Sequence, residues 1–534
     1  MCKNTKLEEK PKSNKSKTNK PKSNKSTTNK PKSSKPKTTY LTKKGYTIIK
    51  NEYTKNEIEN IKNELTVIPK YDPTFCDEPP QIYKVFKENE NKLYLPRYYA
   101  FNKFGQPTEN KLVGSHTNID VPFSGILRQE QKEITKLYFD EVNNEGKNGG
   151  LICAGCGKGK TVMANYIISK LGVKTLVLVH TGPLLTQWIE RIKQYLPTAR
   201  IGIIREKKYD VVDKDIVIGM IQTIYNKNDY PDYVFRDFGL LVADECHHLA
   251  ARAFCKTLKK CCFRYNLGLT ATPDRKDGTT CVFKWYLGKI VYESPEEKDS
   301  DVLAHIYKFK DNDESYSNII RNYKGRLNLP SMITNIVNYN KRNKFVLSLL
   351  PKLIKEKRTI LMLSERVEHV NYFTDKIAKQ KIATCGKYVG QTKESVLKES
   401  LKCRIIVGTY SMIAEGFDCK SLDTLIMLTP KVDIKQIVGR ILRKQASERT
   451  IKPLIIDISD EFSSFPKKTE KRIRYYSVRE YDIKYFDVDG NKPKVVAVES
   501  KQKNKRKSDN NSSNKYNNYN NPKNKKRTFK FNDS

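Results

Sequence analysis

The stretch Ala154-Gly-Cys-Gly-Lys-Gly-Lys-Thr161 is the most informative segment of this chain. It follows an apolar run over 150–154, which predicts a strand, and it precedes a segment from Thr161 onward that predicts a helix. In that setting a glycine-rich turn lets backbone N–H groups surround phosphates at the helix N-terminus. We therefore expect a phosphate-binding loop in which Lys160 neutralises phosphates and Thr161 binds Mg²⁺. The alternative is a glycine-rich turn with an incidental Lys-Thr pair. The predicted nucleotide contacts from this loop are Ala154, which replaces the first glycine of the motif, Gly155, Cys156, Gly157, Lys158, Gly159, Lys160 and Thr161.

Short apolar runs alternate with helical stretches on both sides of this loop. They occupy 150–154, 175–179, 216–221, 240–243 and 267–270 in one half, and 359–363, 404–407 and 424–428 in the other. Uninterrupted apolar strands separated by helices predict a parallel sheet covered on both faces. The chain is therefore predicted to be an α/β protein with two such sheets in tandem.

Changes in composition divide the chain further. A ten-residue repeat begins at Lys10, Lys20 and Lys30, and its prolines and lack of apolar residues predict a disordered basic arm. The aromatic and basic run over 94–101 predicts either a nucleic-acid surface or local packing. The predicted segments are a Lys-rich arm over 1–44, a small mixed N-terminal accessory domain over 45–117, a first lobe with the phosphate-binding loop over 118–295, a linker over 296–335, a second lobe with an extension over 336–495 and a disordered basic tail over 496–534.

The net charge points to a polyanionic partner. The 534 residues carry a formal charge of +41, and both termini are rich in Lys. Such an excess favours nucleic acid, with a solubilising surface as the alternative. No apolar run approaches the roughly 18 residues of a membrane span, and the first residues do not resemble a secretory signal. We expect an intracellular, unsecreted protein with reduced cysteines and no membrane partner; cytoplasm, nucleus and virion stay open.

An acidic pair follows one of the predicted strands. Asp244 and Glu245 come directly after the apolar run 240–243, at the strand end where open α/β sheets bind ligands. Together with the phosphate loop, this predicts that Asp244 binds Mg²⁺ and that Glu245 orients or deprotonates a water molecule. His247 and His248 follow, and we interpret them as couplers to the next loop rather than as metal ligands.

A third group of polar residues lies in the second half of the chain. Gln436, Arg440 and Arg443 are spaced three to four residues apart, so a helix would place them on one face. Two guanidinium groups on one face suit a phosphate, and phosphoryl transfer requires such cations. A solvated basic helix face is the alternative. We predict catalytic roles for Gln436, Arg440 and Arg443 beside Lys160 and Glu245.

In their order along the chain, these segments resemble the motifs of superfamily 2 helicases and translocases. Residues 127–131 (Leu-Arg-Gln-Glu-Gln) resemble the segment that contacts adenine, and residues 178–188 and 221–223 resemble two strand-gripping motifs. The resemblance implies two RecA-like lobes, ATP and Mg²⁺ as cofactors, and a nucleic-acid partner. It adds ATP contacts at Arg128, Gln131, Gly416 and Asp418, a DExH box of Asp244, Glu245, Cys246 and His247, and coupling residues His248, Thr270, Ala271 and Thr272.

The motif details are most similar to one branch of that superfamily. The Asp-Glu-Cys-His-His box and the Glu-Gly-Phe-Asp run ending at Asp418 resemble the branch that contains the DNA-repair and transcription helicase XPB and helicases of phages and large DNA viruses. This resemblance implies an ATP-dependent helicase that acts on DNA more than on RNA. A duplex translocase or remodelling ATPase that does not separate strands, and an RNA helicase, remain alternatives.

Overall fold

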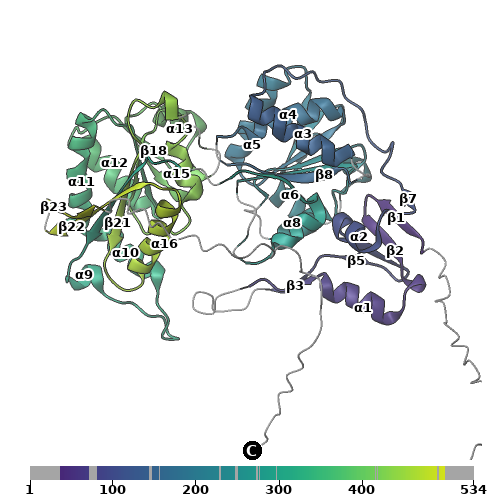
Figure 1. Ribbon diagram of the computed structural model, residues 1–534, viewed down its shortest axis with the longest axis horizontal. Coiled ribbons are helices and arrows are strands. Elements are labelled where there is room, and N and C mark those ends of the chain that lie inside the picture. Colours follow the sequence, from purple (N-terminus) through teal and green to yellow (C-terminus); the bar gives the residue numbers. More distant parts are fainter. Residues whose placement is uncertain are drawn as a thin grey trace, which may run out of the picture.

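The computed structural model describes residues 37–70, 81–143, 147–155, 157–227, 230–246, 251–271, 275, 277–295, 298–414, 417, 419–444, 446–489 and 492–498. Two α/β lobes lie next to each other, and a small N-terminal domain packs on the first (Figure 1). The predicted α/β class is confirmed. Several predictions concern parts of the chain outside the described residues: Cys156, His247, His248, Thr272, Gly416, Asp418, the basic repeat and the C-terminal tail.

The first lobe contains an eight-stranded sheet in the order β11-β10-β12-β9-β13-β14-β8-β15, parallel except for β11. Leu151, Leu176 and Leu241 pack into one hydrophobic core and their neighbours Ile152, Val177 and Val242 into another, so both sheet faces are covered. The strands are β8 (Gly149–Cys153), β9 (Thr175–Val179), β10 (Ile201–Arg205), β11 (Lys208–Tyr209), β12 (Ile216–Met220), β13 (Leu240–Ala243), β14 (Tyr265–Thr270) and β15 (Ile290–Glu293). The helices are α3 (Gln129–Asn143), α4 (Lys160–Leu171) and α5 (Gly182–Tyr195) on one core, and α6 (Ile221–Asn226), α7 (Ala251–Leu258) and α8 (Thr280–Leu287) on the other.

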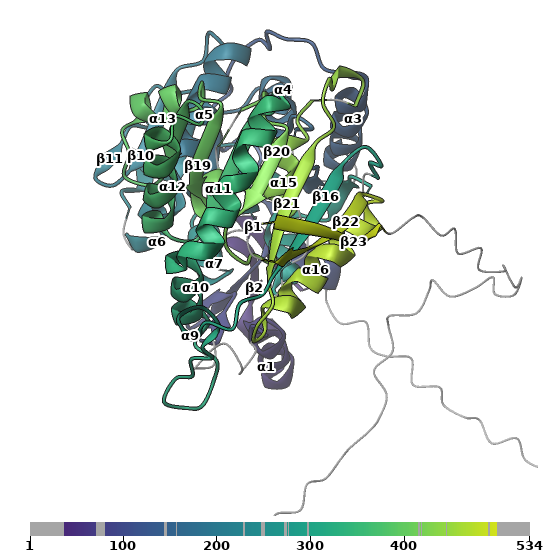
Figure 2. The ribbon, with the colours of Figure 1, turned by 90° about the vertical axis from the view of Figure 1, so that its left-hand side faces the viewer.

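The second lobe, which faces the viewer in Figure 2, has a sheet in the order β18-β19-β17-β20-β21-β16-β22-β23. All neighbours are parallel except β22 and β23. The strands are β16 (Leu303–Phe309), β17 (Ile360–Ser364), β18 (Cys385–Tyr388), β19 (Ile405–Thr409), β20 (Thr424–Met427), β21 (Leu454–Asp460), β22 (Asp482–Asp489) and β23 (Lys492–Val498). The helices are α9 (Glu314–Ser317), α10 (Leu329–Asn338), α11 (Asn340–Lys355), α12 (Val367–Lys379), α13 (Glu394–Ser400), α14 (Tyr410–Ala414), α15 (Lys435–Ile441) and α16 (Phe465–Val478).

The structure shifts two of the predicted domain boundaries. Strand β16 lies within the predicted linker 296–335, yet it is hydrogen-bonded between β21 and β22. His305 and Lys308 interrupt the apolar run, which hides this strand in the sequence. Strand β1 (Thr39–Thr42) likewise lies inside the predicted arm 1–44.

The N-terminal domain is a five-stranded sheet in the order β5-β6-β2-β1-β7, with two helices and a short β3-β4 pair. Its core includes Val282 and Trp285 from α8 and Cys255 from α7, so the domain shares a hydrophobic core with the first lobe. Its elements are β1, β2 (Gly45–Ile49), α1 (Lys55–Glu64), β3 (Thr66–Val67), β4 (Tyr83–Lys84), β5 (Lys87–Glu88), β6 (Lys92–Leu95), α2 (Arg97–Phe104) and β7 (Glu109–Asn110).

Part of the aromatic and basic run over 94–101 packs against the first lobe. Arg97, Tyr98 and Tyr99 are buried, and Arg97 donates hydrogen bonds to the carbonyl oxygens of Phe263 and Arg264. That part of the run is local packing.

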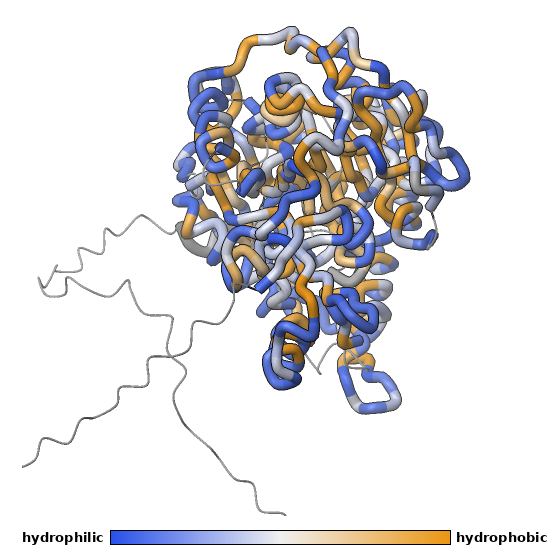
Figure 3. The backbone as a smooth tube through the Cα atoms, turned by 90° about the vertical axis from the view of Figure 1, so that its right-hand side faces the viewer, coloured by the Kyte–Doolittle hydropathy of each residue, from blue (hydrophilic) through white to orange (hydrophobic). Residues whose placement is uncertain are grey.

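Hydrophobic positions concentrate inside the molecule and hydrophilic ones outside (Figure 3). Among the described residues, no helix is long and apolar enough to cross a membrane.

Candidate active site

The phosphate-type loop connects β8 to α4 as its sequence predicts. Gly157 and Gly159 adopt positive φ values of 81° and 79°, which side chains with a Cβ rarely tolerate. An added Cβ at Gly155 or Gly157 would meet no atom within 4 Å, so the loop leaves open space above its backbone. The Nζ of Lys160 lies 3.1 Å from the carbonyl oxygen of Ala154, across the mouth of the loop. Loop and lysine thus form a cradle that fits an anionic group.

The segment before α3 supports this loop from one side. The side-chain amide of Gln131 donates to the carbonyl oxygen of Lys158 at 3.0 Å, and its oxygen accepts from the backbone N–H of Arg128 at 3.0 Å. A Cβ at Gly159 would come within 2.3 Å of the Gln131 amide nitrogen. Both amide atoms of Gln131 therefore bind the protein itself and hold the loop; its predicted contact with adenine stays a prediction.

The acidic pair lies at the end of β13, beside the loop. Asp244 is 5% exposed, and burial, together with the charge of Glu245, raises its pKa to about 6. The indole N–H of Trp188 in α5 donates a hydrogen bond to Asp244 Oδ2 at 2.7 Å, and this bond lowers the pKa of Asp244. Lys160 Nζ lies 3.4 Å from Glu245 Oε1. The lysine of the loop and the acidic pair thus form one charged cluster, and Trp188 is a member that sequence reasoning did not assign to it.

The second lobe contributes the third predicted group, with one difference. Helix α15 ends at Ile441, so Arg443 follows the helix instead of lying on its face. Arg440 Nη1 and Arg443 Nη2 nevertheless converge, donating to the carbonyl oxygen of Phe417 at 2.8 Å and 2.7 Å. The expected alignment on one helical face is therefore wrong for Arg443, although the two guanidinium groups lie together.

These groups line a single cavity of about 520 Å³ between the lobes. Its size lies within the range of small-molecule sites. The first lobe contributes Ile126, Arg128, Gln131, Gly155, Gly157, Gly159, Lys160, Thr161, Val162, Leu184, Gln187, Arg191, Tyr195, Asp244 and Glu245, and the second contributes Lys420, Gln436, Arg440, Arg443 and Glu448.

Sequence reasoning missed several lining residues, and two of them stand out, Ile126 and Lys420. Ile126 is 91% exposed, an unusual state for a large apolar side chain, and it lies at this cavity two residues before Arg128. Lys420 adds a cation from the second lobe. A weak signal for Ile126 was its place beside the segment 127–131; for Lys420 the sequence offered none.

Two of the predicted coupling residues, Thr270 and Ala271, lie behind the loop. The Thr270 carbonyl oxygen accepts from the backbone N–H of Ala154 at 3.0 Å, and Ala271 lines a second crevice together with Gly155 and Gly439 of α15. Cys246 is buried, and burial raises the pKa of its thiol. Residues 270–271 therefore contact the loop on one side and face the second lobe on the other.

Two of the segments expected to grip a strand are also joined. The Gln222 side chain donates to the carbonyl oxygen of His180 at 2.7 Å, which links the ends of β9 and β12. Glu190 of α5 and Lys398 of α13 form an ion pair of 3.5 Å across the lobes.

A phosphate-type loop and an acidic pair in one parallel-sheet lobe, completed by two arginines from a second such lobe, define a class: the two-lobed ATPases of the helicase superfamilies. Comparison with known proteins agrees. Residues 124–275 match the family described as "Type III restriction enzyme, res subunit". The chain is 34% identical over 461 residues to L396 of Acanthamoeba polyphaga mimivirus, named as a candidate ATP-dependent RNA helicase, covering 84% of this chain and 87% of that one.

Other viral proteins are similar as well. QP509L of African swine fever virus, also named as a candidate ATP-dependent RNA helicase, is 30% identical over 390 residues, which is 67% of this chain and 74% of the relative. Protein 161L of Invertebrate iridescent virus 6, named as a candidate helicase, is 25% identical over 405 residues, or 72% of this chain and 87% of the relative. The crystal structure of T4 UvsW aligns with 81% of this chain and 96% of its own, at 19% identity and a TM-score of 0.32. This chain belongs to the superfamily 2 ATP-dependent helicases.

Proposed function

We propose that this helicase hydrolyses Mg·ATP in the cavity between its lobes. The observation that carries the proposal is the meeting of the loop over 154–161, the acidic pair and the two arginines in that one cavity. Lys160 and the loop amides bind the phosphates, while Thr161 and Asp244 hold Mg²⁺. The ion neutralises phosphate charge when it is bound.

The fit for a cation rests on the acidic pair itself. Two carboxyl groups lie next to each other, one of them buried, and burial together with the second charge raises the pKa of Asp244. A cation at Asp244 relieves that repulsion.

The remaining groups act on the water and on the developing charge. Glu245 orients the attacking water and accepts its proton. Arg440 and Arg443, with Gln436, approach from the second lobe and stabilise the transferred phosphoryl group. Because they lie across the cavity from the loop, hydrolysis requires the lobes to be close, and its completion allows them to separate. The residues outside the described part, His247, His248, Thr272, Gly416 and Asp418, keep the coupling and ribose roles that the family resemblance implies.

The nucleic acid is proposed to be DNA. Support comes from the motif similarity to the branch with XPB and the phage helicases, and from the net charge of +41. RNA is the second candidate, because the names of two relatives specify RNA.

The test uses a panel of single- and double-stranded DNA and RNA. Each is assayed for stimulation of ATPase and for strand displacement, with Lys160→Ala as the inactive control. The panel tests both the coupling of ATP hydrolysis to nucleic acid and the choice of DNA over RNA. Stimulation by DNA alone supports the proposal. Stimulation by RNA alone selects the second candidate. An ATPase that no nucleic acid stimulates contradicts the proposed coupling.

A further inference from the structure

Two tyrosines of the N-terminal domain share one face of its sheet. Thr47 of β2 is paired with Tyr40 of β1 on one side and with Tyr94 of β6 on the other, and Tyr94 is paired in turn with Lys87 of β5. Side chains directly opposite each other in neighbouring strands point to the same face. Lys87, Tyr94, Thr47 and Tyr40 therefore form one row across four strands. We call this face, with the lysines described below, the tyrosine row.

The opposite face of the sheet is the packed one. Leu41, Tyr46, Ile48 and Leu93 alternate with the row residues and are buried in the core of the domain. The two tyrosines are only partly buried, and Thr47 between them is 2% exposed. The row is thus the outer face of a sheet whose stability depends on its inner face.

Lysines surround both rings. Lys92 and Lys111 place their ammonium groups 5.8 Å and 5.0 Å from the centre of the Tyr40 ring, and Lys44 lies 5.6 Å from that of Tyr94. These lysines and Lys87 are exposed. Within the described ranges, Lys111 pairs with Glu109 at 3.4 Å, whereas Lys44, Lys87 and Lys92 lie near no carboxylate at ion-pair distance. Three of these four lysines therefore carry a charge that no carboxylate in the described part of the chain pairs with.

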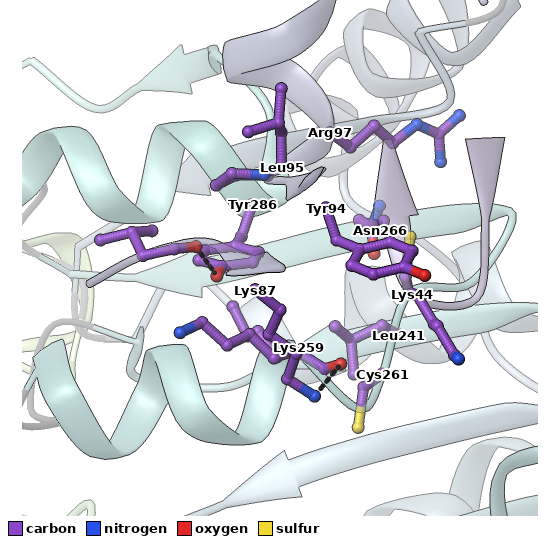
Figure 4. Close-up of a pocket in the computed structure, with 15 residues that line it drawn as sticks. Lys44, Lys87, Tyr94, Leu95, Arg97, Leu241, Lys259, Cys261, Asn266 and Tyr286 are labelled. Carbon is purple, nitrogen blue, oxygen red and sulfur yellow. Dashed lines mark hydrogen bonds between the residues drawn. The ribbon is translucent and has the colours of Figure 1, made fainter. Parts of the chain in front are cut away.

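The charge continues into the crevice between this domain and the first lobe. Lys44, Lys87 and Tyr94 line that crevice together with Lys259 and Cys261, as Figure 4 shows. Desolvation at the crevice, and then the charge of Lys44, lower the pKa of Lys87. Burial, with Lys87 nearby, lowers the pKa of Lys259 to about 8. Because the charge of Lys44 lowers the pKa of Lys87 and the charge of Lys87 lowers that of Lys259, an anion bound here would relieve repulsion.

The spacing of the rings indicates the form of the polyanion. Tyr40 and Tyr94 are two strands apart, which puts their backbones about 9–10 Å apart. Successive bases of a duplex are about 3.4 Å apart along each strand. The two rings therefore suit separated bases of an extended strand, on which aromatic side chains stack while cations contact the backbone. An acidic protein would use the lysines but not the pair of partly exposed rings.

We propose that the tyrosine row binds single-stranded nucleic acid outside the cleft between the lobes, with Tyr40 and Tyr94 stacking on bases and Lys44, Lys87 and Lys92 contacting phosphates. The inference rests on the proposed function, since it assumes that the protein acts on nucleic acid. It assigns to the N-terminal domain a contact that the motifs of the two lobes do not supply.

The test measures binding of fluorescein-labelled oligothymidylate and oligouridylate to the full chain, without nucleotide, over a series of salt concentrations. The triple variant Lys44→Gln, Lys87→Gln and Lys92→Gln is compared with a matched triple, Lys352→Gln, Lys355→Gln and Lys379→Gln, on exposed positions of α11 and α12. Each phosphate contact of a single strand contributes about 0.7 to the log–log salt slope, so the first triple should reduce the slope by about 2. The matched triple should leave it near wild type.

The rings are tested separately. Tyr40→Leu with Tyr94→Leu should weaken binding about tenfold or more, whereas the Tyr→Phe pair should bind like wild type because phenyl rings still stack. Circular dichroism of the Leu pair shows whether its loss of binding is a loss of folding. ATPase at saturating strand should persist in all variants. If the wild type binds and is stimulated while the Leu pair and the first lysine triple match it in affinity and slope, the tyrosine row is refuted and the proposed function stands. If the wild type itself neither binds nor responds to nucleic acid, both fail.

Discussion

The hydrogen bond from Trp188 to Asp244 offers a sharp test of the site, because the chain contains only two tryptophans. Trp188 is 1% exposed, and its indole donates to a buried carboxylate at 2.7 Å. Trp285, the other tryptophan, is partly buried in α8 against the edge of Tyr99, with ring centres 5.7 Å apart. Trp188→Phe and Trp285→Phe thus remove the same chemical group, from a site beside Asp244 and from a site remote from it.

The expected size follows from the bond that is lost. A hydrogen bond to a charged group contributes about 1.5–3 kcal/mol, and removing a residue that orients a metal-binding side chain costs about 10–100-fold in metal affinity or activity. Trp188→Phe should therefore raise the Mg²⁺ concentration for half-maximal ATPase, or lower the turnover rate, by about 10–100-fold. Trp285→Phe should stay close to wild type in both.

Steady-state ATPase over a Mg²⁺ titration at fixed ATP measures both quantities, and circular dichroism confirms that each variant is folded. Trp285→Phe leaves Trp188 as the sole tryptophan, so its fluorescence should change when Mg·ATP is added. Equal Mg²⁺ dependence of the two variants, with no fluorescence response, would refute the assignment of Asp244 to the metal.

Four further outcomes are expected. Glu245→Gln should retain ATP binding in a filter assay while hydrolysis falls by about 10² or more, because an amide cannot accept the proton; loss of binding would make Glu245 a structural residue. Arg443→Ala should lower kcat by about 10³ with nucleotide-free strand binding unchanged, and Arg443→Lys should restore little of it, since an ammonium cannot replace the planar guanidinium; a full-speed Ala variant would remove Arg443 from the site. Arg342 and Asp460 are fully buried and joined at 2.6 Å, so Arg342→Met should lower the free energy of unfolding in urea by about 3–5 kcal/mol, and a loss below about 1 kcal/mol would contradict this estimate. Burial, followed by the charges of nearby cations, lowers the pKa of His305 to about 4. Because the folded state resists protonation of this ring, the free energy of unfolding should be at its full value above about pH 6.5 and decline toward pH 4. His305→Gln should flatten that decline in urea melts.

The sequence determined the elements that depend on neighbouring residues. The loop over 154–161, the acidic pair after β13 and most of the parallel strands were predictable, because glycine spacing, apolar runs and strand-end carboxylates are properties of short segments. The order of these motifs along the chain also indicated the helicase family. Where local pattern failed, as for β16, polar residues on an internal strand interrupted the run that marks a strand.

Tertiary structure decided which distant side chains meet. Trp188 and Asp244 are 56 positions apart in the sequence, and strands separate Tyr40 from Tyr94, so no local signal indicates that either pair lies close together. Arg443 lies beyond the end of α15 and still donates to the carbonyl oxygen of Phe417, which the spacing of the sequence did not indicate. Such contacts are set by the order of strands in each sheet and by packing between elements. The periodicity of a sequence predicts helices and strands, but the same helices and strands can be arranged in more than one way. That is the physical reason why the chemistry of this protein could be predicted from its motifs, while the partners that tune and position that chemistry could not.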